Sequence, residues 1–242
     1  MHTEGASRVF GLLVLIVALA TPAVRAQDDH GFRFVRIKYG EEVGWGGRGG
    51  EPWSHDYPRA ELHLYEALER TTQVFVEGPP LVLTLSDERI FEYPVLYLCE
   101  PGYWSMDEDE LSNLKEYLNR GGFILFDDFR GERELNQLLS ELQRLYPDRE
   151  PVELPEDHFI WTIYYDIDPV AAPSLVSGRF GFGGTFEDRY FALFDDDGRM
   201  MALILYNQDI GDGWEWPEYN LQQASTTAFQ MGINFILYAL TH

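Results

Sequence analysis

Hydrophobic and polar positions along the chain follow strand-like and helix-like spacing in turn. Apolar residues take alternate places over residues 32–39, which predicts a first strand. Continuous apolar runs at Pro94–Cys99 and Phe123–Phe126 predict strands that are buried on both faces. Helical spacing predicts helices that begin at Pro58, at Ser105 with a Ser105–Glu108 capping box, within 135–145 and within 224–239. Such alternation predicts an α/β domain with a doubly wound, mostly parallel sheet.

The second half of the chain is richer in segments of strand type. Alternation and β-branched or aromatic residues predict strands at 159–165, 190–194 and 201–206. Shorter strands are predicted earlier in the chain, at 73–76 and 81–85. We expect the additional strands of the second half to form a β-rich edge or insertion beside the parallel sheet.

The first 26 residues have the pattern of a cleavable export signal. Arg8 precedes an apolar run over residues 9–20, and small residues before the end of the segment predict cleavage after Ala26. The run is shorter than the roughly 20 apolar residues that span a bilayer, although an uncleaved anchor is the alternative. We therefore expect a periplasmic or secreted protein in which residues 27–242 form a single domain, with no membrane span after cleavage.

The chain is strongly acidic, with a formal net charge of −23. Cleavage would remove a net charge of +1, from Glu4, Arg8 and Arg25, and would leave −24. Nucleic acids and anionic lipids are polyanions, so this acidity argues against both as partners. An envelope protein or a sugar is the expected type of partner.

Polar residues that directly follow the predicted strands are the candidates for a binding site, because ligands bind beyond the carboxyl ends of strands in open parallel sheets. This rule selects Tyr39, the pair Asp127 and Asp128, and Asp209, and we add His158 from the segment before a predicted strand. The adjacent carboxylates suit a hard cation or acid–base chemistry. Asp127 and Asp128 are thus the metal candidates, and Asp128 and His158 the catalytic candidates. The alternatives are a helix cap that pairs with an arginine, and a hydrogen-bonded structural histidine.

Cys99 is the single cysteine of the chain, which excludes an internal disulfide. Its position at the end of a predicted central strand fits a small buried residue, or a thiol nucleophile with a histidine partner. The sequence has no Gly-x-Ser-x-Gly, no Gly-x-x-x-x-Gly-Lys and no His-Glu-x-x-His motif. Tryptophans in predicted loops either close the core or contact a sugar or a partner; they are Trp45, Trp53, Trp214 and Trp216.

Six short motifs follow one another over almost all of residues 27–242. They are Phe34-Val35-Arg36-Ile37-Lys38-Tyr39, Trp53 with Asp56-Tyr57-Pro58-Arg59-Ala60, Phe91-x-Tyr93-Pro94, Gly121–Asp128, Leu154-Pro155-x-Asp157-His158 and Gly232-x-Asn234-x-x-x-Tyr238. The combination resembles the domain-of-unknown-function family DUF4159. This resemblance implies a branch of the class I glutamine amidotransferase-like, flavodoxin-like fold, found in bacterial and often exported proteins with no established activity.

Amidotransferases of this fold carry a cysteine at a sharp turn after a central strand, but the matching turn here is Asp127-Asp128-Phe129. Cys99 is on a different strand, and Cys99-Glu100-Pro101-Gly102 stands where family members often have a Thr-Gly-His-like run. The resemblance therefore implies a non-catalytic binding or interaction module, and it does not identify a cofactor. One alternative is an envelope hydrolase that uses Asp127, Asp128 and His158, with or without a metal. Another is a scaffold that docks through its tryptophan loops.

Overall fold

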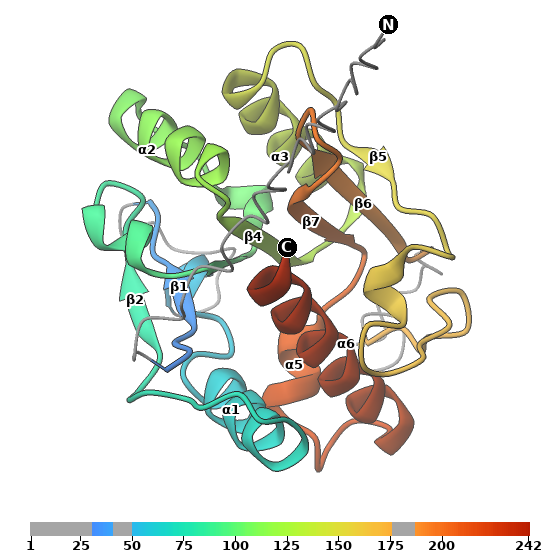
Figure 1. Cartoon of the computed structure of the whole chain (residues 1–242). Coiled ribbons are helices and arrows are strands. Elements are labelled where there is room, and N and C mark those ends of the chain that lie inside the picture. The colour runs from blue at the N-terminus through green and yellow to red at the C-terminus, as the bar shows by residue number, and fades with distance from the viewer. Residues whose placement is uncertain (1–30, 41–49, 176–186) are drawn as a thin grey trace, which may run out of the picture. The chain divides into compact units, whose positions relative to one another are not determined.

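Seven strands form one sheet within residues 31–40, 50–175 and 187–242, which are the residues described by the computed structural model (Figure 1). The strand order is β2-β1-β3-β4-β7-β6-β5. Five strands run parallel, namely β1 (Val35–Ile37), β2 (Leu81–Leu83), β3 (Val95–Cys99), β4 (Phe123–Phe129) and β7 (Met200–Tyr206). The remaining two, β6 (Arg189–Phe194) and β5 (Val152–Glu153), extend the edge in antiparallel orientation. The prediction of a mostly parallel α/β sheet with extra strands in the second half is confirmed.

The direction of strand addition reverses between β1 and β3. The chain passes from β1 to β2 on one side, and then returns to β3 on the other side and continues to β4 and β7. Connections that leave adjacent strands in opposite directions open a crevice at the carboxyl ends of those strands, which is where ligands bind in open α/β sheets. The topology therefore selects the carboxyl ends of β1, β3 and β4 as the place to look for a site.

Helices cover both faces of the sheet. In the described ranges these are α1 (Arg59–Thr71), α5 (Ile210–Glu215) and α6 (Gln222–Thr241) on one face, and α2 (Glu108–Asn119) and α3 (Gly131–Leu145) on the other (Figure 1). The two faces bury separate apolar clusters, because successive strand residues point to opposite sides. This is the three-layer arrangement expected when parallel strands are buried on both faces.

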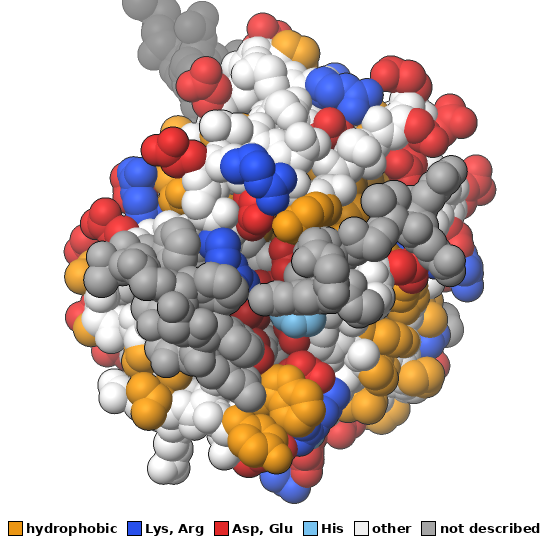
Figure 2. Space-filling view, turned by 180° about the vertical axis from the view of Figure 1, so that it is seen from behind, with side chains coloured by type: hydrophobic (Ala, Val, Ile, Leu, Met, Phe, Trp, Pro, Cys, Tyr) orange, Lys and Arg blue, Asp and Glu red, His pale blue; other side chains and the backbone are white. Residues whose placement is uncertain are grey.

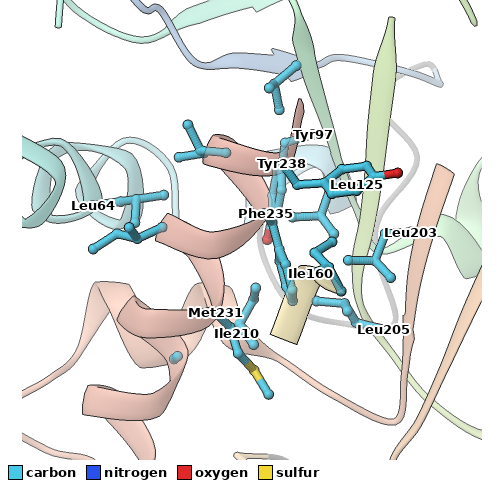
Figure 3. Packing of buried hydrophobic residues seen from close by; sticks show 14 of the residues in the cluster. Leu64, Tyr97, Leu125, Ile160, Leu203, Leu205, Ile210, Met231, Phe235 and Tyr238 are labelled. Carbon is cyan, nitrogen blue, oxygen red and sulfur yellow. The ribbon is translucent and has the colours of Figure 1, made fainter. Parts of the chain in front are cut away.

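The long helix α6 packs on the sheet through the stripe that its sequence predicts. Met231, Phe235 and Tyr238 lie with Leu125 of β4 and Leu203 of β7 in one cluster of buried side chains (Figure 3). Complete burial of one such side chain stabilises the fold by about 1.5–3 kcal/mol. The stripe therefore fixes α6, and with it the preceding segment that carries α5, against the sheet.

One predicted helix boundary is wrong for a tertiary reason. The capping box of α2 is formed by Asp107 and Glu110, two residues after the predicted Ser105 and Glu108. The chain does not turn earlier because Met106 is buried and its N–H donates to Glu141 of α3. The helix can begin only once the chain has passed this contact.

The predicted strand at 159–165 is wrong as well. A single 3-10 turn, Phe159–Trp161, is followed by irregular chain. The buried side chain of Asn234 on α6 accepts from the N–H of Tyr165 and donates to the carbonyls of Ile160 and Tyr165. The helix thus satisfies backbone groups that a neighbouring strand would otherwise pair. The predicted strand at 73–76 is reduced to an isolated bridge between Val76 and Phe32.

Two of the four tryptophans from predicted loops close the core. Trp214 is fully buried in α5, and Trp53 is buried in a 3-10 turn. A docking surface around Trp214 is therefore not available. The predicted export signal at residues 1–26 and Trp45 lie outside the described residues. Within the part that is described, no helix combines the length and apolar character needed to cross a membrane.

Candidate functional site

Buried carboxyl groups converge at the carboxyl ends of the central strands. We call this set the carboxylate cluster; its members are Asp56, Glu100, Asp127, Asp128, Asp209 and Asp212. Figure 2 shows a face on which a histidine side chain lies among acidic side chains. Three of the five residues predicted for a site, Asp127, Asp128 and Asp209, are brought together in this cluster. Burial of so many acidic groups is costly unless each is paired, protonated or bound to a cation.

Asp127 ties the end of β4 to the first turn of α5. One of its oxygens accepts hydrogen bonds from the Tyr97 hydroxyl at 2.7 Å and the Gly211 N–H at 2.9 Å, and the other accepts from the Ile210 N–H at 3.2 Å. Burial and the neighbouring charge of Asp128 raise the pKa of Asp127 to about 6, although these hydrogen bonds act to lower it. Asp127 is therefore a satisfied anchor, and not a group with free ligand atoms.

Asp128 holds the ring of His55. Asp128 Oδ2 lies 2.5 Å from His55 Nδ1, and Asp128 Oδ1 accepts from Arg130 at 2.6 Å. Burial opposes ionisation of Asp128, but the hydrogen bond and charge of His55 and the charge of Arg130 outweigh it and hold the pKa of Asp128 well below its usual range. Because the ionised carboxylate can only accept, Nδ1 of His55 carries a proton. The lone pair of the neutral ring is then on Nε2.

Asp56 is the buried acid that lacks such partners. Its side-chain oxygen Oδ1 lies 3.7 Å from His55 Nε2. Neither buried oxygen accepts a hydrogen bond from an N–H or hydroxyl group of another described residue. Burial, followed by the charges of Asp209 and Asp128, raises the pKa of Asp56 well above its usual range. The cluster thus contains one carboxyl group that accepts no hydrogen bond from an N–H or hydroxyl group of a described residue and whose side-chain contact with Glu215 also raises its pKa.

Strained backbone is concentrated at this edge of the sheet. Among the described residues, the non-glycine residues with positive φ are Asp56, Glu100, Asp128 and Asn207, with values between 52° and 65°. The left-handed conformation costs roughly 1–2 kcal/mol per residue, less for Asp and Asn than for Glu. At Asp128 it accompanies a register shift between Phe126 and Phe129. This irregularity lets two adjacent acids enter one cluster, although regular strand geometry would separate them.

Tyr39 and Asp209 support the site from its two sides. The Tyr39 hydroxyl lies 2.7 Å from the carbonyl oxygens of Cys99, the last residue of β3, and of Glu100, which follows it. Asp209 caps α5 by accepting from the N–H of Asp212 at 2.9 Å. Both predicted residues are therefore at the site, and both have structural partners.

His158 is not brought to the cluster. Its Nδ1 accepts from the N–H of Ile160, and its ring lies against Tyr238, with centroids 5.9 Å apart. The Tyr238 ring also contacts Phe123, at the beginning of β4. His158 thus lies toward the amino-terminal edge of the sheet, opposite the end of β4 that carries Asp128. The structural alternative, a hydrogen-bonded cap, describes it better than a catalytic role beside the aspartates.

His55 is the histidine that sequence reasoning missed. It lies in the connection from β1 to α1, directly after the 3-10 turn Pro52–Ser54. Loops that follow a parallel strand return from the carboxyl edge, so the strand-end rule covers the whole connection and not only its first residues.

Cys99 fits the first of its two predicted alternatives, a small buried residue at the end of a central strand. It is fully buried, and burial and the charge of Asp128 raise the pKa of its thiol well above the usual range.

Two groups of possible metal ligands occur among the described residues, and they share one member. In each group, one ligand atom per residue lies within 4.8 Å of the others. The first group is His55, Asp56, Cys99 and Asp128, and the second is Asp56, Asp212 and Glu215. The shared residue is Asp56, the buried acid that accepts no hydrogen bond from an N–H or hydroxyl group of a described residue.

Fold and site together define an α/β domain with a buried acidic site at the carboxyl edge of a mostly parallel sheet. The chain belongs to the family described as domain of unknown function (DUF4159), whose sequence model matches residues 33–240. The matched range contains the whole carboxylate cluster and His55. A search of curated proteins finds no match to the chain.

Proposed function

We propose that this domain binds a divalent transition-metal ion between His55 Nε2 and Asp56. The observation that carries the proposal is that both buried oxygens of Asp56 lack an N–H or hydroxyl donor among the described residues, while a histidine nitrogen lies 3.7 Å from one of them. An unpaired buried carboxylate is strongly unfavourable. A cation compensates the charge and also displaces the proton that burial otherwise favours.

The geometry around His55 is suited to a metal. Histidines that bind metals commonly donate their second ring N–H to a carboxylate, which fixes the tautomer and the ring orientation. Asp128 provides this interaction at 2.5 Å. Two donors at about 2.0–2.2 Å from a tetrahedral ion lie roughly 3.4 Å apart, close to the observed separation of His55 and Asp56. An imidazole ligand favours zinc and related ions over calcium or magnesium.

The fold supports a site at this position. The five parallel strands have the order β2-β1-β3-β4-β7, which corresponds to the 2-1-3-4-5 order of flavodoxin-like sheets. That correspondence supports the flavodoxin-like fold implied by the family resemblance. The net charge of −23 supports a cationic ligand over nucleic acid. We further propose, from the pattern of residues 1–26, that binding takes place in the periplasm or outside the cell.

Titration of the purified protein with Zn²⁺, Mn²⁺, Ca²⁺ and Mg²⁺ in a calorimeter tests the proposal. We expect Zn²⁺ or Mn²⁺ to bind and to raise the unfolding temperature, because a ligand that binds only the folded state stabilises it. Asp56→Asn should weaken binding at least tenfold. Asp196→Asn is the control, since the Asp196 side chain is 89% exposed and pairs with Arg149. Absence of binding, or equal binding by Asp56→Asn, would overturn the proposal.

A second candidate function is hydrolysis with His55 as general base and no metal. The observation that favours it is the contact between half-buried His55 and buried Asp128, which resembles the histidine–carboxylate pair of many hydrolases. It replaces His158 by His55 in the predicted hydrolase alternative. Turnover of ester or phosphoester substrates in the presence of chelator, lost in His55→Gln but not in His63→Gln, would support it. Inactivity toward such a panel would count against it.

A further inference from the structure

We infer that the site holds two divalent cations and that the carboxylate of Asp56 bridges them. The second ion is bound by Asp212 and Glu215 of α5. This inference rests on the proposed function, because the first ion is the one between His55 and Asp56.

The two oxygens of Asp56 face different parts of the molecule. Oδ1 lies 3.7 Å from His55 Nε2, on the side of the first ligand group. Oδ2 faces α5, because a Cβ atom added to Gly211 would lie 2.6 Å from it. Neither oxygen accepts a hydrogen bond from an N–H or hydroxyl group of a described residue. A buried carboxylate that accepts no hydrogen bond from an N–H or hydroxyl group and that belongs to two separate groups of possible ligands is suited to bridge two ions.

Two acids of α5 lie within reach of the Asp56 carboxyl group, and one of them, Glu215, contacts it through a side-chain hydrogen bond. Asp212 and Glu215 each contribute a ligand atom that lies within 4.8 Å of Asp56 and of the other. They are three residues apart and therefore lie on one face of the helix. Asn220 donates to Asp212 Oδ2 at 2.9 Å and orients that side chain. Glu215 is half-buried, which gives the second position access to solvent.

The two positions differ in chemistry. The first offers an imidazole nitrogen and suits a transition-metal ion. The second offers carboxylates alone, which are the ligands preferred by harder ions such as Mn²⁺ and Mg²⁺. Paired ions of this kind lie about 3.5–4 Å apart and bind an oxyanion or a water between them. Phosphate groups are thus the class of ligand that such a centre would take.

The charge balance at this edge also favours more than one ion. The nearby basic side chains are already engaged, because His55 and Arg130 both contact Asp128. Arg36 is paired with Glu61 inside the core.

Mn²⁺ is the probe that tests the inference with the full chain. Calorimetry and metal analysis should give two equivalents of Mn²⁺ per chain. Electron paramagnetic resonance should show the exchange-coupled spectrum of a bridged pair, in place of the six-line signal of an isolated ion. Glu215→Gln should retain one equivalent and lose the coupling. Glu218→Gln is the control, since it lies three residues further along, is 47% exposed and pairs with Arg59.

The outcomes separate this inference from the proposed function. If the native protein binds one equivalent of Mn²⁺, and both His55→Ala and Glu215→Gln abolish this binding, the site holds a single ion with ligands from both groups. That result would overturn the bridged pair and leave the proposed function standing. Two equivalents of Mn²⁺ without an exchange-coupled spectrum would show that Asp56 does not bridge the two ions. Failure of both Mn²⁺ and Zn²⁺ to bind would overturn the proposed function as well. Because Glu215 is half-buried, its variant is expected to fold, so the test stands even if Asp56→Asn does not.

Discussion

Asp128 and His55 are separated by 73 positions in the chain, yet His55 Nδ1 lies 2.5 Å from Asp128 Oδ2. The contact joins the β1–α1 connection to the end of β4 across the switch point of the sheet. The contact fixes the protonation of both side chains. Asp128 stays ionised, and the neutral imidazole of His55 carries its proton on Nδ1 and its lone pair on Nε2. The proposed metal site depends on this relationship, because it aims the Nε2 lone pair toward Asp56.

Asp128→Asn should weaken Zn²⁺ binding by about 10–100-fold, as is usual when the carboxylate behind a metal-bound histidine is lost. Asparagine has nearly the same shape, and it tolerates the positive φ of 58° at this position, so the fold should persist. Calorimetric titration measures the affinity, and circular dichroism checks the fold. Unchanged affinity in a folded variant would exclude the orienting role of Asp128.

Arg36 and Glu61 form a fully buried ion pair, with 2.5 Å between Arg36 Nε and Glu61 Oε1. Arg36→Met would leave the carboxylate of Glu61 buried without its partner and should cost about 3–5 kcal/mol of unfolding free energy. The double variant Arg36→Met/Glu61→Leu should recover part of the loss, since an apolar pair requires no desolvation of charge but still lacks the hydrogen bonds from Arg36 to the carbonyls of Trp53 and His55. Urea unfolding measures both. Additive effects of the two single substitutions would show that the pair is not energetically coupled.

The same arginine explains why the sequence predicted only part of the site. Arg36 also donates to the backbone carbonyls of Trp53 and His55, so a side chain on β1 sets the path of the β1–α1 connection. Hydrophobic periodicity reports which faces of an element are buried, and it found β4 and the acids at its end. It carries no information about a loop held by a distant side chain, and His55 and Asp56 were missed for that reason.

His158 is the opposite case, a residue that the sequence selected and that the structure does not bring to the carboxylate cluster. Its selection depended on a strand at 159–165, whose alternating apolar residues fit that pattern. Contacts with α6, through Asn234, make this segment a turn and loop instead. The strand-end rule itself was sound, because the positions it selected directly after strands, Asp127, Asp128 and Asp209, do converge. It failed where the assigned element was wrong, since tertiary hydrogen bonds overrode local propensity.

Gly211→Ala should disturb the α5 side of the centre. The added Cβ would lie 2.6 Å from Asp56 Oδ2 and 2.8 Å from the Tyr97 hydroxyl, so either α5 or Asp56 must move. Overpacking of this kind costs about 1–3 kcal/mol. Gly213→Ala is the matched control in the same helix, because its Cβ would meet Ala228 and Leu175 on the apolar side. We expect both variants to lose stability in urea unfolding, and only Gly211→Ala to lose metal affinity. Equal metal affinity in the two variants would contradict the position assigned to Asp56.

The free energy of unfolding should fall as the pH rises from about 4.5 to 6.5 without metal. Burial raises the pKa of Asp127 to about 6 from an ordinary value of 3.8, and burial raises the pKa of Asp188 to about 6 as well. The folded state therefore holds protons that the unfolded chain has already released, and this stabilisation is present below pH 3.8 and lost as the pH passes 6. The lowered pKa of Asp128 acts in the opposite sense, but only below its ordinary value and hence outside this window. The lowered pKa of His158 opposes the fall within the window, because the unfolded chain protonates this imidazole before the folded protein does. For fully buried Asp127 the loss of unfolding free energy is on the order of 1–3 kcal/mol.

Urea unfolding at a series of pH values measures how steeply the free energy of unfolding depends on pH, and Asp127→Asn should make this dependence flatter. Stability that rises across the window would show that these acids are ionised in the folded protein at pH 4.5.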